Sequence, residues 1–383
     1  MPSFPGENRL PGLDVLRAIA IIWVMCFHSF LIGGLNEHFT WLSRYGWMGV
    51  DLFFVLSGFL IGSQVLSPLA RGEPISLRDF YVRRAFRILP AFWIVLVLYL
   101  VFPWFREAPG LESWWKFATF TLNLLINYDH NQAFSHAWSL CIEEHFYLLF
   151  PLLACLLVRR ISPAGFAAML LVCVSTGMAL RAEVWLHDNA IAPNRNWYLE
   201  DIYYPTWNRL DGLLGGVSLA ALKAYQPTLW QRLGAYGNQV LLLGILIVMV
   251  AIWLFQDRAG LLGNTIGWPV LSTGLALLVF AGAQRTSWLG CRTLPGAGWL
   301  AAISYSLYLV HKPIYHIVAA HFGDALNGRG LLAFTSYAVA SLVGAAMLYY
   351  MVERPGLQLR SRLLTPTSSV ESGLNTASIK ALP

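Results

Sequence analysis

LDVLRAIAIIWVMCFHSF, residues 13–30, has the length and apolarity of a membrane-spanning helix, yet it carries three ionisable side chains. A helix rises about 1.5 Å and turns about 100° per residue, so Arg17 and His28 fall on nearly the same face about 16 Å apart. Asp14 lies on the same stripe, one turn before Arg17, where the two can pair. Ionisable groups in an apolar helix are costly. The stripe is therefore expected to face other helices or to take part in chemistry.

The composition extends this interpretation to the whole chain. Of the 383 residues, 57% are hydrophobic and only 12% are charged, whereas soluble domains carry about 25% charged residues. The 16 Trp, 16 Tyr and 22 Phe suit a protein with many anchors at the membrane interface. We predict an all-α polytopic membrane protein.

Apolar segments long enough to cross a bilayer recur along the sequence. A full crossing takes about twenty residues, so WWKFATFTLNLLIN (114–127) is too short and is predicted to be an interfacial or re-entrant helix. The remaining segments predict about ten transmembrane helices, near 13–33, 47–67, 86–105, 137–158, 164–181, 207–224, 237–255, 266–283, 299–320 and 331–352.

The positive charges predict the orientation. With the N-terminus in the cytoplasm, the basic residues gather in the cytoplasmic loops, as the positive-inside rule requires. They form no single patch, so the net charge of +6 does not indicate a nucleic-acid-binding protein. We expect a protein of the bacterial cytoplasmic (inner) membrane with both termini inside. The basic residues concerned are Arg71, Arg78, Arg83, Arg84, Arg159, Arg160, Lys223, Arg232, Arg285, Arg292, Arg354, Arg360 and Arg362.

The domain organisation follows from the same pattern. Residues 1–360 are predicted to form one transmembrane domain, and the polar, Ser/Thr-rich segment 361–383 a disordered cytoplasmic tail. The first helix lacks a small-residue cleavage site and is interpreted as a retained span. The five cysteines lack paired spacing, so no metal site is predicted.

RDFYVRRAFRILPAFW (78–93) places Arg84 and Arg87 on one helix face. Two interpretations stay open. The arginines are either positive charges that set topology, which most inside loops possess, or a clamp for a phosphate-rich ligand, because guanidinium groups bind phosphate bidentately.

SHAWSLCIEEHFYLLFP (135–151) carries Glu143 and Glu144 near the start of an apolar helix, where carboxylates are expensive to bury. Glu143 shares a face with Ser139 and Tyr147. A carboxylate beside an imidazole raises its basicity, as behind a general base. We expect one glutamate to converge with His28 and His136 in the outer half of the bundle; alternatively, the pair is an interfacial anchor.

Three further stretches carry polar residues in apolar surroundings. MGVDLFFVLSGFLIG (48–62) contains Asp51 and Ser57, with Gly58 explained by close helix packing. SYSLYLVHKPIY (304–315) places His311 and Lys312 just before a proline that is expected to kink the helix and free carbonyl groups. RLDGLLGG (209–216) contributes a gate or an ion pair through Arg209 and Asp211.

The outer segment 181–207 is rich in aromatic side chains. They suit either stacking on sugar rings or anchoring at the membrane interface. These aromatic residues are Trp185, Trp197, Tyr198, Tyr203, Tyr204 and Trp207.

Taken in order, these motifs resemble the acyltransferase-3 family of integral membrane O-acyltransferases, which modify bacterial surface sugars, some lipids and peptidoglycan. The matching blocks are the Arg17-to-His28 spacing, DLFFVLSGFLI (51–61), Arg84 with Arg87, WSLCIEEHFY (138–147), RLDGLLGG, SLYLVHKPI (306–314) and ERP (353–355). The sequence departs from the family at His145, where relatives often have Gln. Some relatives carry a fused SGNH-type domain, which we do not identify in this sequence.

The resemblance implies acyl transfer from cytoplasmic acyl-CoA, commonly acetyl-CoA, to a hydroxyl group at the outer face. Arg84 and Arg87 match the arginines on the CoA side, Arg17 and His28 the first-helix pair required for activity, and Glu143 with Glu144 the acidic pair. We assign supporting places to Asp14, Asp51, Ser57, His136, Trp138, Ser139, Arg209, Asp211 and His311.

The resulting hypothesis is a membrane O-acyltransferase without a permanently bound cofactor. Acyl-CoA is the donor, and a saccharide or lipid-linked saccharide among the membrane lipids is the acceptor. His28 is a general base or a transient acyl carrier, polarised by Glu144 or Glu143. The main alternative is a transporter or flippase of a lipid-linked saccharide that uses the same residues as a proton relay. A third is an outer-face glycosyltransferase or polymerase that uses one of the glutamates.

Overall fold

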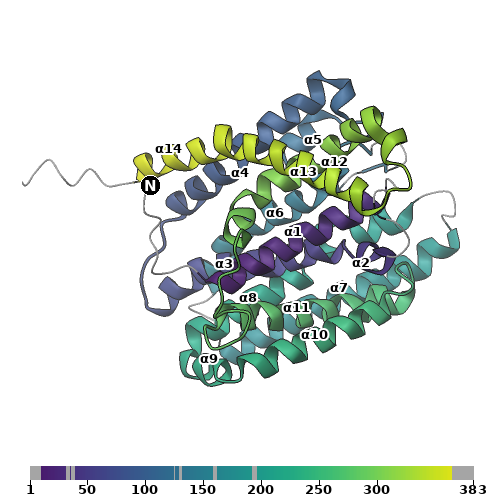
Figure 1. Ribbon diagram of the computed structural model, residues 1–383. Helices are drawn as coiled ribbons and strands as arrows, with labels where there is room; N and C mark the ends of the chain where they lie inside the picture. Colours follow the sequence, from purple (N-terminus) through teal and green to yellow (C-terminus); the bar gives the residue numbers. More distant parts are fainter. Residues whose placement is uncertain are drawn as a thin grey trace, which may run out of the picture.

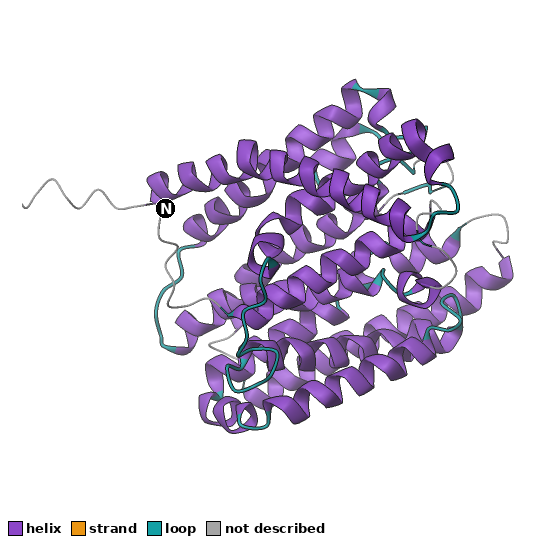
Figure 2. Cartoon of the chain, in the orientation of Figure 1, coloured by secondary structure: helices purple, strands orange, loops and turns teal. Residues whose placement is uncertain are grey.

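The computed structural model describes residues 10–31, 35, 39–124, 126–128, 132–157, 162–191 and 196–364. Across these residues the chain consists of helices joined by loops, with no strand (Figures 1 and 2). Eight helical segments among them are long and apolar enough to cross a membrane. The prediction of an all-α polytopic membrane protein is confirmed.

A long helix occupies each of the predicted spans. The eight segments do not include α8, which has only 15 residues, or α12, which carries His311 and Lys312. The long helices are α1 (Pro11–Leu31), α3 (Met48–Ala70), α4 (Leu77–Val101), α6 (Trp138–Leu157), α7 (Pro163–Ile191), α8 (Asp211–Tyr225), α10 (Gly237–Leu254), α11 (Trp268–Ala283), α12 (Ala297–Leu326) and α13 (Leu331–Leu348).

Shorter elements complete the bundle. The described residues of 114–127 form α5 (Trp114–Ala118) and the turn η3 (Leu122–Leu124), which are far too short to span a bilayer, as predicted. The final helix, α14 (Arg354–Leu364), continues past the predicted boundary at 360. The rest of the predicted tail, Arg159 and Arg160 lie outside the described residues. The other short elements are α2 (Thr40–Arg44), η2 (Pro103–Phe105), η4 (Ser135–Ala137), η5 (Tyr198–Tyr203), η6 (Thr206–Asn208), α9 (Pro227–Gly234), η7 (Gly263–Gly267) and η8 (Tyr349–Glu353).

Glycines bring α3 and α8 into close contact in the interior. A Cβ atom added at Gly58 would overlap the backbone carbonyl of Leu213, and one at Gly216 would overlap that of Val55. Without a hydrophobic force between helices in lipid, such small residues allow the backbones to approach and pack. The packing explanation for Gly58 is confirmed.

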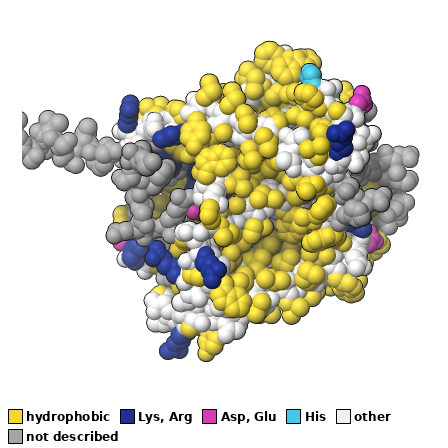
Figure 3. Space-filling view, viewed as in Figure 1, with side chains coloured by type: hydrophobic (Ala, Val, Ile, Leu, Met, Phe, Trp, Pro, Cys, Tyr) yellow, Lys and Arg dark blue, Asp and Glu magenta, His cyan; other side chains and the backbone are white. Residues whose placement is uncertain are grey.

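The outer helices present apolar side chains to their surroundings. Leu171 on α7 is 68% exposed and Leu246 on α10 is 61% exposed. The visible face shows a broad apolar area, with most of its Lys and Arg toward the end where the N-terminus lies (Figure 3). An exposed apolar surface of this extent is suited to lipid. By contrast, α1 packs against α3, α11 and α12, and its ionisable residues Asp14, Arg17 and His28 are partly buried.

Candidate active site

A cavity of about 330 Å³ opens among α1, α3, α4, α6 and α12. We call it the arginine cavity. It brings together seven of the residues singled out in the sequence: Arg17, Ser57, Arg84, Arg87, Ser139, Glu143 and Glu144. Helical spacing explains why Arg84 lies with Arg87 and Ser139 with Glu143, because residues three or four apart share a helix face. The capping of α4 by Ser76, whose hydroxyl accepts a hydrogen bond of 3.2 Å from the Asp79 amide, orients its first turns.

The cations of the arginine cavity keep donors available for a ligand. Arg84 donates one hydrogen bond of 3.2 Å to Gln64 and lies 5.3 Å from the centre of the Tyr147 ring. Arg17 lies 3.9 Å from Asp14, so the pair predicted for the first helix is present. A guanidinium has five N–H donors, and the hydrogen bond to Gln64 uses one of those of Arg84. The cavity is therefore suited to an anionic ligand.

One further cation, Arg360 on α14, also lines the arginine cavity. In the sequence it was only one member of a basic C-terminal stretch. No local pattern could assign it to the cavity, because α14 reaches the cavity by packing against α4 in the folded chain (Figure 1).

Glu143 is held by its neighbours in the arginine cavity. It accepts a hydrogen bond of 3.0 Å from the Ser57 hydroxyl and one of 2.6 Å from the Tyr147 hydroxyl. The shared helix face predicted for Glu143 and Tyr147 is confirmed. Glu144 lines the same cavity, next to Glu143. Both carboxylates thus belong with the arginines.

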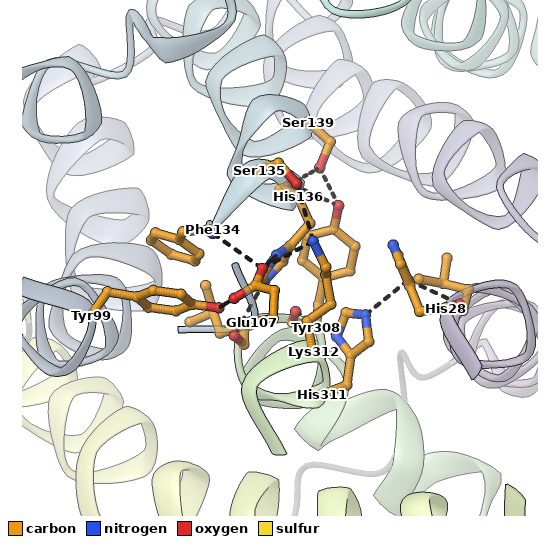
Figure 4. A network of polar contacts seen from close by, with 12 residues as sticks. His28, Tyr99, Glu107, Phe134, Ser135, His136, Ser139, Tyr308, His311 and Lys312 are labelled. Carbon is orange, nitrogen blue, oxygen red and sulfur yellow. Dashed lines mark hydrogen bonds and ion pairs between the residues drawn. The ribbon is translucent and has the colours of Figure 1, made fainter. Parts of the chain in front are cut away.

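A second polar group lies beyond this cavity, toward the end of α1. We call His28, Glu107, His136, His311 and Lys312 the histidine cluster (Figure 4). The His28 Nδ1 and His311 Nε2 atoms are 3.0 Å apart, and the His136 and His311 ring centres are 5.3 Å apart. The expected convergence of His28 with His136 is confirmed, with His311 between them.

The carboxylate in the histidine cluster is Glu107, and the expectation that Glu143 or Glu144 would fill this place is wrong. Those two residues point into the arginine cavity on α6, whereas Glu107 comes from the loop after η2. Its Oε1 atom lies 2.9 Å from the Lys312 ammonium and 3.9 Å from His136 Nδ1. The sequence carried no signal for Glu107, since it stands in an irregular loop far from both partners.

The rest of the environment of Glu107 is also polar. The Tyr99 hydroxyl donates a hydrogen bond of 2.7 Å to Oε2, and the Phe134 amide donates one of 3.1 Å to Oε1. Lys312 donates a second hydrogen bond, 3.0 Å long, to the Ser135 hydroxyl. Buried charges are tolerated when they are paired and hydrogen-bonded in this way.

Pro313 explains the position of His136. Proline has no N–H, so it leaves the carbonyl of the residue four positions earlier, Leu309, without its helical donor. His136 Nε2 lies 3.3 Å from the Leu309 oxygen and takes that place. The expected freeing of a carbonyl group is confirmed, although α12 runs continuously from Ala297 to Leu326.

Phe134 holds the chain in an unusual conformation just before His136. Its φ of +55° lies in the left-handed region, which non-glycine residues with bulky side chains rarely adopt. The ring stacks on Tyr99 at 4.4 Å and on Phe117 at 5.4 Å, while its amide binds Glu107. Packing thus holds a strained backbone next to a candidate site, as is common at functional sites.

Ser139 and Tyr308 join the two groups. Both line the arginine cavity, and their hydroxyl oxygens are 2.6 Å apart. The Tyr308 hydroxyl also donates a hydrogen bond of 2.9 Å to the carbonyl of His136. Ser139 and Tyr308 therefore separate the arginine cavity from the histidine cluster and contact both.

The residues Asp51, Arg209 and Asp211 form a separate structural group. Arg209 pairs with Asp51 at 2.8 Å, and Asp211 pairs with Arg181 at 2.8 Å. The sequence offered an ion pair between Arg209 and Asp211 as one of two predictions, and that pairing is wrong. Each residue instead pairs with a buried side chain from another helix. Arg209 also lies 5.3 Å from the centre of the Trp138 ring. These ion pairs link α3 and α7 to the start of α8.

The aromatic side chains of 196–207 divide into two kinds. Tyr203 and Tyr204 are 5% and 4% exposed and pack against Trp138, so they are not placed to stack on a sugar. Burial raises the pKa of the Tyr203 hydroxyl to about 12. Trp207 is 50% exposed and remains suited to either interpretation.

Comparison with known proteins finds a matching family model and several relatives. The family model described as an acyltransferase domain matches residues 10–350. O-acetyltransferase OatA of Staphylococcus aureus is 29% identical over 379 residues, covering 91% of this chain and 57% of the relative. The putative peptidoglycan O-acetyltransferase YrhL of Bacillus subtilis is 26% identical over 372 residues, covering 91% and 55%.

A third relative, peptidoglycan O-acetyltransferase OatA of Listeria monocytogenes, is 26% identical over 335 residues, covering 81% of this chain and 50% of the relative. The chain thus spans about half the length of the curated relatives it matches. No solved structure matches it. The family match covers nearly all of the helical bundle, including the histidine cluster and every residue named at the arginine cavity except Arg360, and the chain belongs to the acyltransferase-3 family of membrane proteins.

Proposed function

We propose that this protein is a membrane O-acetyltransferase that takes an acetyl group from acetyl-CoA on the cytoplasmic side. The acceptor is a hydroxyl group of an extracytoplasmic or lipid-linked saccharide. One observation carries the proposal: a cavity with four arginines shares a wall, made by Ser139 and Tyr308, with a cluster of three histidines. The relatives named as peptidoglycan O-acetyltransferases favour a peptidoglycan saccharide as acceptor.

The arginine cavity is the donor site in this proposal. Arg84, Arg87 and Arg360 are suited to the phosphates of CoA, since guanidinium groups bind phosphate bidentately. At about 330 Å³ the cavity is at the small end of ligand pockets, which hold about 300–1,000 Å³. We infer that the acyl arm enters it while the nucleotide stays at its mouth.

His28 is the base in this proposal. It removes the proton from the acceptor hydroxyl, whose oxygen attacks the thioester carbonyl carbon. The carbon–sulfur bond breaks, and the CoA sulfur leaves with the electron pair and takes up the proton from the imidazolium. An ester forms, free CoA is released and His28 returns to its neutral state. General-base catalysis of this kind is worth about 10²–10⁴-fold in rate.

The orientation follows from the same assignment. The Lys and Arg side chains gather toward the end of the bundle where α1 begins, which is the end that carries the arginine cavity (Figure 3). By the positive-inside rule that end faces the cytoplasm, where acyl-CoA is available. His28 lies toward the other end of α1, nearer the outer face.

The test is release of CoA by the purified protein. Protein in lipid nanodiscs, supplied with acetyl-CoA and a soluble peptidoglycan saccharide, is expected to release free CoA thiol and to form an O-acetyl ester, measured by thiol titration and mass spectrometry. The His28→Ala variant is expected to lose both products, and His321→Ala, at an exposed position on α12, to keep them. Transport of the saccharide without CoA release would contradict the proposal and support the transporter alternative.

A further inference from the structure

The contacts of His311 determine which of its nitrogens carries a proton. Its Nδ1 atom lies 2.8 Å from the carbonyl oxygen of Tyr308 and 3.2 Å from that of Leu307. A carbonyl oxygen only accepts hydrogen bonds, so Nδ1 must be the donor. His311 is fully buried, at 0% exposure, and a charged imidazolium is costly there. The neutral ring therefore has an unprotonated Nε2, which is an acceptor.

The same reasoning extends to His28. Its Nδ1 atom lies 3.0 Å from that acceptor nitrogen of His311 and 3.1 Å from the carbonyl oxygen of Val24. Both neighbours accept hydrogen bonds, so Nδ1 of His28 carries the proton. A neutral imidazole has one N–H, and its lone pair for accepting a proton is then on Nε2.

We propose that His311 is a positioning residue that fixes His28 as the Nδ1–H tautomer, so that Nε2 is the basic nitrogen. The inference rests on the proposed function, in which His28 takes the acceptor proton. When Nε2 takes that proton, Nδ1–H remains bonded to His311 Nε2, and the hydrogen bond becomes charge-assisted and stronger. His311 thereby stabilises the transient imidazolium without itself touching substrate, the part that a carboxylate plays in a Ser-His-Asp triad.

The remaining charges around the pair suit this role. Lys312, next to His311, would disfavour a positive His28 if its charge were unbalanced. Its partner Glu107, at 2.9 Å, supplies the balancing negative charge, while the His136 ring lies edge-to-face with that of His311, with the ring centres 5.3 Å apart (Figure 4). The groups that face the imidazoles are thus His136 from η4, Lys312 from α12 and Glu107 from the loop after η2.

The direct test is the tautomer itself. The protein has nine histidines; uniform ¹⁵N-histidine labelling and comparison with a His28→Gln variant identify the His28 signals by solid-state NMR in lipid. The expected result at neutral pH, without substrate, is a protonated Nδ1 and an unprotonated Nε2. A protonated Nε2, whether in the other tautomer or in an imidazolium, would overturn the proposal.

A variant adds a kinetic test. His311→Phe keeps an aromatic ring beside Tyr315 but removes the acceptor, so the kcat for O-acetylation is expected to fall about 10–100-fold, as for other orienting partners. The KM for acetyl-CoA is expected to stay the same because His311 does not line the arginine cavity. In the variant only the Val24 carbonyl still accepts a hydrogen bond from Nδ1, so the NMR signals of His28 should show a larger share of the other tautomer than in the wild type.

The control is His321→Phe, an exposed histidine on the same helix, which should leave kcat unchanged. An unchanged kcat in His311→Phe would contradict the proposal, and a variant that fails to fold leaves the wild-type tautomer to decide. The proposed function and the His28 tautomer are tested by different measurements. Wild-type protein that never releases CoA refutes the proposed function, whereas the tautomer is measured without substrate.

Discussion

The arginine cavity and the histidine cluster are neighbours that use their polar groups in opposite ways. In the cavity, Arg84 makes a single side-chain hydrogen bond to the described residues from its five donors and faces open volume. In the cluster, the single carboxylate of Glu107 accepts hydrogen bonds from Tyr99 and Phe134 and forms an ion pair with Lys312. A group with unused donors is suited to binding a ligand. A group whose members satisfy one another is held in place before the ligand arrives, as preorganised catalysis requires.

The comparison makes its sharpest prediction at His28. The His28→Ala variant should lose O-acetyl transfer by about 10²–10⁴-fold, because it removes the general base, while acetyl-CoA binding at the arginine cavity is unchanged. The measurement is the rate of ester formation together with the Kd of a non-hydrolysable acetyl-CoA analogue. If the variant kept most of the wild-type rate, the base would have to be another residue.

Loss of two arginines should have an effect of comparable size on a different property, the affinity for CoA. The double variant Arg84→Ala with Arg87→Ala should weaken CoA binding by about 10–100-fold for each arginine, since a hydrogen bond to a charged group is worth about 1.5–3 kcal/mol. Isothermal titration calorimetry with CoA measures this. Arg78→Ala is the matched control, an exposed arginine at the start of the same helix and outside the cavity. Unchanged binding in the double variant would refute the clamp.

Removing the Glu107 side chain should lower the stability of the protein more than its affinity for CoA. Glu107→Ala leaves the Lys312 ammonium without its carboxylate, and breaking a buried ion pair in this way costs about 3–5 kcal/mol; at 11% side-chain exposure we expect the lower end. Thermal unfolding in detergent should show a lower midpoint. Adding Lys312→Met should recover part of the loss, because no unpaired charge remains. Further destabilisation by the second change would contradict the pairing.

The smallest effect is expected at an exposed ion pair of the same kind. Arg71 and Glu73 lie 2.7 Å apart at the surface, with side-chain exposures of 59% and 51%. The arginine lowers the pKa of the Glu73 carboxyl and the carboxylate raises that of Arg71, but water and salt screen such pairs. Glu73→Ala should leave the unfolding midpoint unchanged. A shift as large as that of Glu107→Ala would show that burial is not what distinguishes the two pairs.

The sequence by itself determined the class of fold and most of the arginine cavity. Runs of about twenty apolar residues have no stable alternative to membrane-spanning helices, because unpaired backbone groups are too costly in lipid. Within one helix, spacing specifies the shared face, so Glu143 could be matched to Tyr147 from the chain alone. The ionisable residues of α1 could be assigned to the interior for the same reason, since lipid is a poor environment for charge.

Only the tertiary structure decided which residues lie opposite these polar helix faces. Glu107 reached Lys312 from an irregular loop, Arg360 reached the arginine cavity from the last helix, and His311 came to lie 3.0 Å from His28 across two helices. Helical periodicity specifies the direction of a side chain about its own axis and says nothing of which helix lies opposite. That choice depends on packing over the whole bundle, including the close approach of α3 and α8 at Gly58 and Gly216.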